Sequence, residues 1–286
     1  MIIVKLVGGL GNQMFQYALG RKLSVEHNTE LLLDISWYDS SKDRRYLLDK
    51  FYATTKIATK DDIDRVKESS SAKIKNFFRT HHKKSYIKEL SSEFDQKMLT
   101  VGGKDAYIDG YWQSPKYFLG IEDMIRKEFT LKEKQNEEFN SLLNTIQDEN
   151  SVSLHIRRAD YFAPKNVVLF ATCSLEYYQE AVKLISEKVG TIHLFVFSDD
   201  IEWTKQHLAF PTPHNVTFVS NGKLVDYQEM MLMSSCKHNI TANSTFSWWA
   251  AWLNKNPQKV VVSPKKWFIG KTLNDKDLIP ETWNRI

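Results

Sequence analysis

Residues 5–23 read KLVGGLGNQMFQYALGRKL, which places a glycine-rich turn between a strand and a helix. The residues before the turn, 2–7, form a short apolar run that is typical of a strand. After it, Met14, Tyr17 and Ala18 recur at helical spacing. Glycines in such a turn allow positive φ and let a ligand approach the backbone, while the first N–H groups of the helix point toward it. The turn therefore predicts either a structural connection or a site for an anionic or hydroxyl-rich ligand.

Two common nucleotide-binding motifs do not fit this turn. The residues GGLGNQ lack the G-x-G-x-x-G spacing of a dinucleotide site, and no Gly-Lys-Ser/Thr follows, as it would in a P-loop. A Rossmann-type oxidoreductase is therefore the weakest of the functional alternatives for this chain.

Composition indicates a globular protein of two ordinary domains, since the chain has 286 residues, 42% hydrophobic and 26% charged. The net charge of +4 is mild and does not imply nucleic acid binding. Cys173 and Cys236 lack metal-ligand spacing, which favours a reducing compartment over a disulfide scaffold. No apolar run approaches the roughly 20 residues of a membrane span. We expect a strand rather than a signal peptide at the N-terminus, and a cytoplasmic protein.

Strands and helices alternate along the chain, most regularly in its second half. In the first half we expect strands over 2–7, 30–34 and 106–112, with helices after the glycine turn, after Ser114-Pro115 and over 132–148. In the second half we expect strands over 152–156, 192–197, 216–219, 239–241 and 260–262, with helices over 175–188, from 201, over 225–233 and over 245–253. This alternation predicts parallel sheets with helices on both faces. We place the domain boundary at residue 148, giving domains 1–148 and 149–286. In an alternative arrangement, the C-terminal tail packs back on the first domain.

Unusual polar residues follow four of the expected strands. GGLGNQ follows the first strand, and the others are HIRRADY at 155–161, FSDD at 197–200 and TANSTFSWW at 241–249. In open parallel sheets, ligands bind outside the carboxyl ends of the strands. One ligand site could therefore gather all four motifs.

Two features of the second half suggest a diphosphate ligand. Arg157 and Arg158 end an apolar strand, and guanidinium groups bind phosphate bidentately. Asn243-Ser244-Thr245 precedes a helix whose free N–H groups favour an anion. The structural alternatives are an arginine paired with Asp160 and an ordinary helix cap.

Metal-binding motifs are weak in this sequence. The D-x-D matches at 62–64 and 275–277 do not end apolar strands; the first has the character of a helix start and the second of a polar turn. Asp199-Asp200 fits magnesium, a ribose hydroxyl or a base edge equally well. His81-His82 lies within a basic, partly aromatic stretch from Lys73 to Lys88, which we interpret as a solvated segment, with a peripheral membrane contact as the alternative.

Taken in order, GGLGNQMFQYA, HIRRADY, FSDD and NSTFSWWAAWL resemble the bacterial α-1,2-fucosyltransferases of glycosyltransferase family 11. GYWQSPKYF, at 110–118, is similar to a further block of that family. The resemblance runs from Met1 to about Phe268 and is weakest over roughly 61–105.

The resemblance implies a GT-B-type α/β fold, in which two Rossmann-like lobes with parallel sheets face a central cleft. It implies GDP-L-fucose as donor, no metal or other cofactor, and transfer with inversion to the 2-hydroxyl of a galactose-type acceptor in surface glycan synthesis. The acceptor would be a galactoside or an oligosaccharide, and the alternative is a lipid-linked form of either. With a lipid-linked acceptor the enzyme would lie at the inner face of the membrane. The C-terminal lobe would bind the nucleotide, and the N-terminal lobe would face the sugar and the acceptor.

The resemblance also assigns residues, with Arg157 as the diphosphate clamp and Asp160 as the carboxylate for the acceptor proton. Beside two arginines the pKa of Asp160 should be lowered, so an orienting role stays equally open. The expected donor-binding residues are His155, Arg158, Ser198, Asp199, Asn243, Ser244, Thr245 and Phe246. The expected residues on the sugar and acceptor side are Gly9, Gly11, Asn12, Gln13, Trp112 and Gln113. Gln16 stands where some relatives carry Glu, which weakens the case for a base on the first helix.

Two rival functions stay open. One is a transferase that forms another fucosyl linkage or uses another GDP-sugar on the same scaffold. The other is a catalytically silent protein that binds a GDP-sugar or a glycan. The presence of Arg157, Asp160 and Asn243 argues against a silent protein, because mere binding does not require all three.

Overall fold

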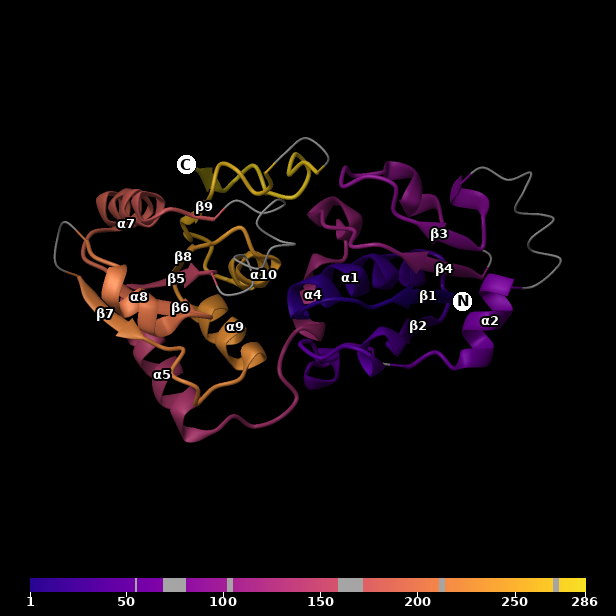
Figure 1. Cartoon of the computed structure of the whole chain (residues 1–286), viewed down its shortest axis with the longest axis horizontal. Helices are drawn as coiled ribbons and strands as arrows, with labels where there is room; N and C mark the ends of the chain where they lie inside the picture. Colours follow the sequence, from indigo (N-terminus) through magenta and orange to yellow (C-terminus); the bar gives the residue numbers. More distant parts are fainter. Residues whose placement is uncertain (55, 69–80, 102–104, 159–171, 211–213, 270–272) are drawn as a thin grey trace. The chain divides into compact units, whose positions relative to one another are not determined.

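The computed structural model describes residues 1–54, 56–68, 81–101, 105–158, 172–210, 214–269 and 273–286. The chain divides into two compact units (Figure 1). The first unit comprises Met1–Glu133 with Lys276–Leu278, and the second comprises Lys134–Asp275 with Ile279–Ile286. Within these ranges each unit contains one parallel sheet, of four strands in the first unit and six in the second, which confirms the expected α/β class.

The sheet of the first unit has the strand order β2-β1-β4-β3, with all neighbours parallel. Its elements are β1 (Ile2–Lys5), α1 (Leu10–Glu26), β2 (Leu31–Asp34), η1 (Ser36–Asp39), η2 (Leu48–Lys50), α2 (Lys60–Glu68), η3 (His81–Lys83), β3 (Tyr86–Lys88), η4 (Gln96–Thr100), β4 (Ala106–Asp109), η5 (Pro115–Phe118) and α4 (Glu122–Glu128). The turn after Ser114 is thus a short 3-10 helix, with Ser114 as its cap. β3 lies in the charged middle of the chain, where no strand is predicted.

Helices α1 and α2 cover opposite faces of this sheet, since successive strand residues point to opposite sides. Ile3 shares a buried cluster with Val66 of α2. Val4 faces α1, where a Cβ on Gly20 would lie only 2.4 Å from the Val4 Cγ2 atom. This contact requires glycine at position 20, and it packs the second half of α1 closely on β1.

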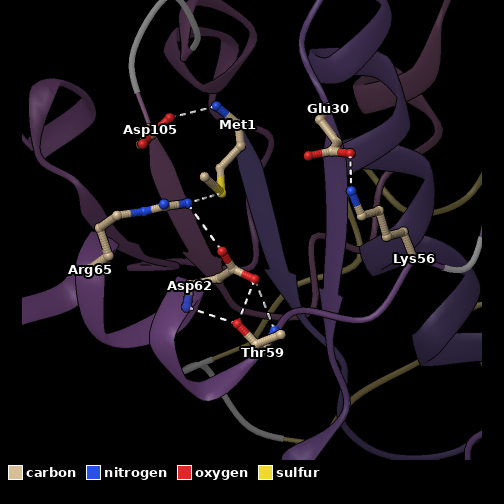
Figure 2. A network of polar contacts seen from close by, with 7 residues as sticks. All are labelled: Met1, Glu30, Lys56, Thr59, Asp62, Arg65 and Asp105. Carbon is tan, nitrogen blue, oxygen red and sulfur yellow. Dashed lines mark hydrogen bonds and ion pairs between the residues drawn. The ribbon is translucent and has the colours of Figure 1, made fainter.

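The N-terminus of α2 is capped by its own side chains (Figure 2). The Asp62 N–H donates to the Thr59 hydroxyl over 3.1 Å, and the Asp62 carboxylate accepts from the Thr59 N–H and hydroxyl at 3.0 and 2.7 Å. Arg65 donates to the other Asp62 oxygen over 3.0 Å. The D-x-D match at 62–64 is therefore a helix start, as the sequence suggests.

The sheet of the second unit has the strand order β10-β9-β8-β5-β6-β7, again with all neighbours parallel. Its elements are α5 (Glu137–Asp148), β5 (Ser151–Ile156), α7 (Leu175–Val189), β6 (His193–Ser198), α8 (Ile201–His207), β7 (Asn215–Phe218), α9 (Asp226–Ser235), β8 (His238–Ile240), α10 (Thr245–Leu253), β9 (Val261–Ser263) and β10 (Asn284–Arg285). α7 packs on the face of β5 that carries Val152, Leu154 and Ile156. α9 packs on β5 and on α10, and α10 packs on β8.

The boundary between the units differs from the predicted one by a single helix. The sequence places the boundary at residue 148, after the polar helix over 132–148. In the structure this helix, α5, packs against α9, so the division falls after Glu133. The short segment Lys276–Leu278 counts with the first unit, where the Asp277 carboxylate accepts from the Phe94 N–H over 2.9 Å and pairs with Lys116 at 2.5 Å.

Candidate active site

The carboxyl ends of three neighbouring strands of the second unit carry most of the predicted donor-binding residues. β5 lies between β8 and β6, so the residues that follow these strands share one edge of the sheet. Arg157 and Arg158 follow β5, Asp199 and Asp200 follow β6, and Asn243 follows β8. The strand order thus brings three of the four motifs together, as expected for a parallel sheet.

Arg157 and Asp199 form an ion pair at this edge, with 3.1 Å between Nη1 and Oδ2. Both side chains are partly buried, at 19% and 18% exposure. The other Asp199 oxygen accepts the Arg158 N–H over 2.8 Å. Asp199 therefore fixes the turn after β5 and orients one edge of the Arg157 guanidinium. Since both of its oxygens serve these contacts, Asp199 is better placed to orient Arg157 than to bind magnesium.

The Arg158 side chain turns toward α8. Its guanidinium carbon lies 3.4 Å from the centre of the Trp203 ring, and its Nε lies 3.8 Å from Asp200 Oδ2. Stacking on an indole is a favourable contact for a guanidinium. The sequence does not distinguish the roles of the two arginines. In the structure, Arg158 supports the turn after β5, whereas the guanidinium of Arg157 is held by Asp199.

Ser198, the last residue of β6, is the centre of a small hydroxyl network. Its N–H donates to the Ser220 hydroxyl over 3.0 Å, and that hydroxyl donates to a Glu229 oxygen over 2.8 Å. The Ser198 hydroxyl accepts the Asp200 N–H over 3.0 Å. Burial raises the pKa of Glu229 to about 7; the hydrogen bond from Ser220 opposes this rise, and the charge of Asp226 adds to it.

The raised pKa of Glu229 predicts a pH-dependent stability. The folded state binds this proton more tightly than the unfolded chain, so the stabilisation is complete below the ordinary value of 4.5 and declines as the pH rises through about 7. Glu229→Gln removes this titration. Between about pH 5 and about pH 8 we expect the melting temperature of the variant to rise by about 3 °C relative to wild type. Thermal melts at both pH values test this, and an unchanged difference would contradict it.

His155 and the start of α10 meet on the face of the sheet opposite α7. His155 is 3% exposed, and its ring centre lies 5.5 Å from that of Phe246. Ser244 caps α10, with its hydroxyl accepting the Phe246 N–H over 3.4 Å. Thr245, also predicted to bind the donor, is the first residue of this helix and is partly exposed. The N–H groups at the start of α10 therefore lie beside the end of β5.

Asn243 has a structural role in addition to its predicted one. Its side chain is buried, donates to the Trp267 carbonyl over 3.0 Å and accepts from the Cys173 thiol at 3.6 Å. These contacts hold the segment after β9 against the start of α10. We infer that Asn243 anchors the loop that connects β8 to Ser244, the cap of α10.

In the first unit, the glycine turn and the end of β4 lie side by side, because β1 and β4 are neighbouring strands. Gly8 has φ +80°, and a Cβ there would lie 2.7 Å from Asn12 Nδ2, so only glycine fits this turn. Gly9 precedes α1 without a side-chain cap. The Gln113 amide donates to Asn12 Oδ1 over 2.9 Å. Asn12 and Gln113 are both partly exposed, and they form a pair of amides at this edge.

Other residues predicted on the sugar side are buried within the architecture. Gln13 is fully buried, and its amide donates to the Arg45 carbonyl over 2.8 Å and accepts the Leu47 N–H over 3.0 Å. Gly11 is buried within α1. Trp112 is buried, and its indole Nε1 has no hydrogen-bond partner within the described ranges. Gln13 and Gly11 therefore build the turn, and only Asn12 and Gln113 offer partly exposed amides.

Three residues of these two edges are absent from the sequence-based prediction of the site. Gln16 is fully buried and joins the ends of β1 and β4, since it accepts the Val7 N–H over 3.0 Å and donates to the Gly110 carbonyl over 3.1 Å. Glu89 accepts two N–H groups after β4, and burial raises its pKa against the lowering effect of those bonds. Glu229 is the third. The sequence offers no clear signal for the last two, because Glu89 follows a strand that was not predicted and Glu229 lies within α9.

Several predicted features lie outside the described residues or away from these edges. Asp160 and the first half of the basic stretch from Lys73 to Lys88, residues 73–80, are outside the described ranges. His82, in the second half of that stretch, pairs with Asp95. Asp275 pairs with Arg285 at 2.9 Å and accepts the Trp267 N–H.

In the part of the chain that the structure describes, no three His, Cys, Asp or Glu side chains form a group that could hold a metal ion, and no helix there is long and apolar enough to cross a membrane.

Sequence comparison relates the whole chain to known glycosyltransferases. Residues 1–286 match the family Glycosyl transferase family 11. An alpha-1,2-colitosyltransferase of Escherichia coli is 34% identical, over 100% of this chain and 99% of its own length. The O-antigen biosynthesis glycosyltransferase WbnK of Escherichia coli is also 34% identical, over 97% and 98%. Human galactoside alpha-(1,2)-fucosyltransferase 1 is 27% identical, over 51% of this chain and 42% of its own.

Structure comparison supports the fold. A mutant of Arabidopsis thaliana FUT1 in complex with GDP superposes with a TM-score of 0.52 at 15% identity, over 99% of this chain and 75% of that one. At this level of identity the likeness concerns the fold, and it agrees with the GT-B-type class that the sequence predicts.

Proposed function

The chain belongs to glycosyltransferase family 11, and from this membership we propose that it transfers L-fucose from GDP-L-fucose to the 2-hydroxyl of a galactose-type acceptor. The bond between fucose C1 and the diphosphate oxygen breaks as the acceptor oxygen bonds to C1 from the opposite face, so the configuration inverts. The acceptor proton passes to a base, and GDP leaves with an additional negative charge. The acceptor is a galactoside or an oligosaccharide used in surface polysaccharide synthesis.

The observation that carries this proposal is the Arg157–Asp199 ion pair beside the start of α10. Asp199 holds one edge of the guanidinium at 3.1 Å, which leaves the group oriented for bidentate binding of diphosphate oxygens. A second source of positive potential follows the neighbouring strand, β8. It consists of the N–H groups at the start of α10, where Ser244 and Thr245 lie. Groups fixed in this way stabilise charge on a leaving group without reorganising during the reaction.

The names of the relatives support the linkage and the type of product. The Escherichia coli colitosyltransferase and the human galactoside fucosyltransferase are both named for 1,2 linkages. WbnK is named for O-antigen biosynthesis, which supports a polysaccharide acceptor. The Arabidopsis protein was solved with GDP, which supports a guanine nucleotide as the carrier of the sugar.

We propose the remaining roles in the reaction for residues of the two edges. We assign nucleotide binding to the second unit, with His155, Ser198 and Phe246 near the guanosine. We assign contacts with the sugar and the acceptor to Asn12 and Gln113 of the first unit. Asp160, which follows β5, is the proposed base or the residue that orients it.

A second candidate donor is GDP-colitose, which is favoured by the identity of 34% over the whole chain with a colitosyltransferase. Colitose is L-fucose without its 3-hydroxyl. A site that hydrogen-bonds the 3-hydroxyl would therefore reject colitose strongly, whereas a site that only accommodates it would discriminate weakly. Rates of transfer from the two donors to the same galactoside distinguish the candidates. Faster transfer from GDP-L-fucose supports the proposal. Faster transfer from GDP-colitose would show that GDP-colitose, and not GDP-L-fucose, is the donor.

We predict that the reaction needs no metal ion. Arg157 and the start of α10 supply the positive charge that a metal ion would otherwise bring to the diphosphate. Activity with excess EDTA should therefore equal activity without it. Loss of activity in EDTA that magnesium or manganese restores would contradict this prediction.

A further inference from the structure

The chain leaves β4 through a turn with an unfavourable backbone conformation. Trp112 has φ +55°, a left-handed conformation that is unfavourable for a bulky residue. The Trp112 carbonyl accepts the Ser114 N–H over 2.8 Å. Between them lies Gln113, whose amide contacts Asn12. The direction of Gln113 therefore depends on whatever holds Trp112 in this conformation.

Glu89 provides that support. It directly follows β3, the strand next to β4. Its Oε2 accepts the Tyr111 N–H over 2.7 Å, and its Oε1 accepts the Trp112 N–H over 3.0 Å. Two successive N–H groups of a turn thus converge on one carboxylate, which is the arrangement of an anion-binding nest. Both bonds are charge-assisted and stronger than bonds between neutral groups.

Gly110 makes the approach of Glu89 feasible. A Cβ at position 110 would lie 2.4 Å from Glu89 Cβ and 2.9 Å from Trp112 Cε2, so any side chain there would displace one of them. The Gly110 carbonyl in turn accepts from Gln16, which also binds the Val7 N–H. The turn is therefore held on both sides, by Gln16 from α1 and by Glu89 from the end of β3.

We propose that Glu89 is a positioning residue for the acceptor side, which fixes the 110–113 turn so that Gln113 and Asn12 present their amides to a carbohydrate hydroxyl. This inference rests on the proposed function of the Asn12–Gln113 pair. Tyr111, which Glu89 also fixes through its N–H, is 48% exposed and offers an aromatic surface beside the amides. Glu89 acts through the turn and does not itself contact the reacting atoms.

A double-mutant cycle tests this role. Glu89→Gln keeps the shape but replaces one acceptor by an NH₂ group that faces a backbone N–H. We expect it to lower the catalytic efficiency for the acceptor about 5-fold, the scale of one hydrogen bond, with the KM for the donor unchanged. In a Gln113→Ala background the same change should cost less than about 2-fold, because Glu89 acts through Gln113. Asp109→Asn is the matched control, since Asp109 ends β4 and its carboxylate accepts from Lys5 and Tyr86 rather than from the turn, and it should have little effect.

A second readout needs no turnover. The side-chain amide NMR signals of Gln113, identified by their loss in Gln113→Ala, should shift in Glu89→Gln and stay in place in Asp109→Asn. Because this result is independent of the donor used, it separates failure of the inference from failure of the proposed function. Gly110→Ala, which displaces Glu89, should shift the same signals and serves if Glu89→Gln does not fold. Three results would each overturn the inference. They are an equal loss of catalytic efficiency from Glu89→Gln in both backgrounds, normal activity of Gln113→Ala, and unmoved Gln113 signals.

Discussion

Replacing Arg157 by alanine is expected to lower transfer by about 100-fold or more, the effect of removing one charge-stabilising group from a preorganised site. The variant loses the cation that we propose to face the leaving diphosphate, and it leaves Asp199, at 18% exposure, without its partner at 3.1 Å. Arg157→Lys is expected to remain at least about 10-fold impaired. An ammonium keeps the charge but cannot bind Asp199 and two phosphate oxygens in one plane. Steady-state kinetics of both variants measure this.

The control for this prediction is Arg65→Lys, because Arg65 is an exposed arginine that pairs with Asp62 on α2. Its activity should equal that of the wild type. Near-normal turnover of Arg157→Lys would show that charge alone suffices and that the orientation imposed by Asp199 has no catalytic effect.

Asn12→Ala is expected to lower catalytic efficiency by about 10-fold or more while GDP affinity stays within a few-fold. Asn12 accepts the Gln113 amide over 2.9 Å, so its loss removes one amide and releases the other. The proposed nucleotide contacts lie in the second unit and should be unaffected. The melting temperature should stay within a few degrees, because an amide in the first helical turn contributes at most about 1–2 kcal/mol. Kinetics, calorimetry with GDP and thermal melts measure the three quantities.

The matched control for Asn12 is Asn140→Ala, which removes a more exposed amide on α5 that donates to the Gln135 carbonyl. It should leave all three quantities unchanged. If Asn12→Ala kept normal kinetics, the glycine turn would be architectural only. If its GDP affinity fell together with its activity, the nucleotide would contact the first unit, contrary to the assignment made above.

Most of the fold could be predicted because strands and helices alternate with clear periodicity. The same reasoning predicted that Arg157, Asp199 and Ser244 share one sheet edge, since each follows a strand and the carboxyl ends of parallel strands meet. The predicted boundary at residue 148 differs from the division after Glu133, because the sequence of the polar helix α5 does not indicate that it packs against α9.

The roles of individual polar side chains were harder to predict. Gln13 has the residue type of a sugar ligand, but its partners, Arg45 and Leu47, lie more than thirty positions away, and local sequence does not indicate which way an amide points. Glu89 lies in a charged segment without periodicity, and its N–H partners follow another strand. Such contacts depend on the strand order, which local patterns do not specify.

The most direct test of the account is the linkage of the product formed from GDP-L-fucose and a free galactoside in the presence of EDTA. The product is isolated and its glycosidic bond assigned by NMR. The account predicts an α-1,2 linkage to galactose, formed by the wild-type protein and about 100-fold more slowly by Arg157→Ala. A product with another linkage, or no transfer from GDP-L-fucose with or without metal ions, would contradict it.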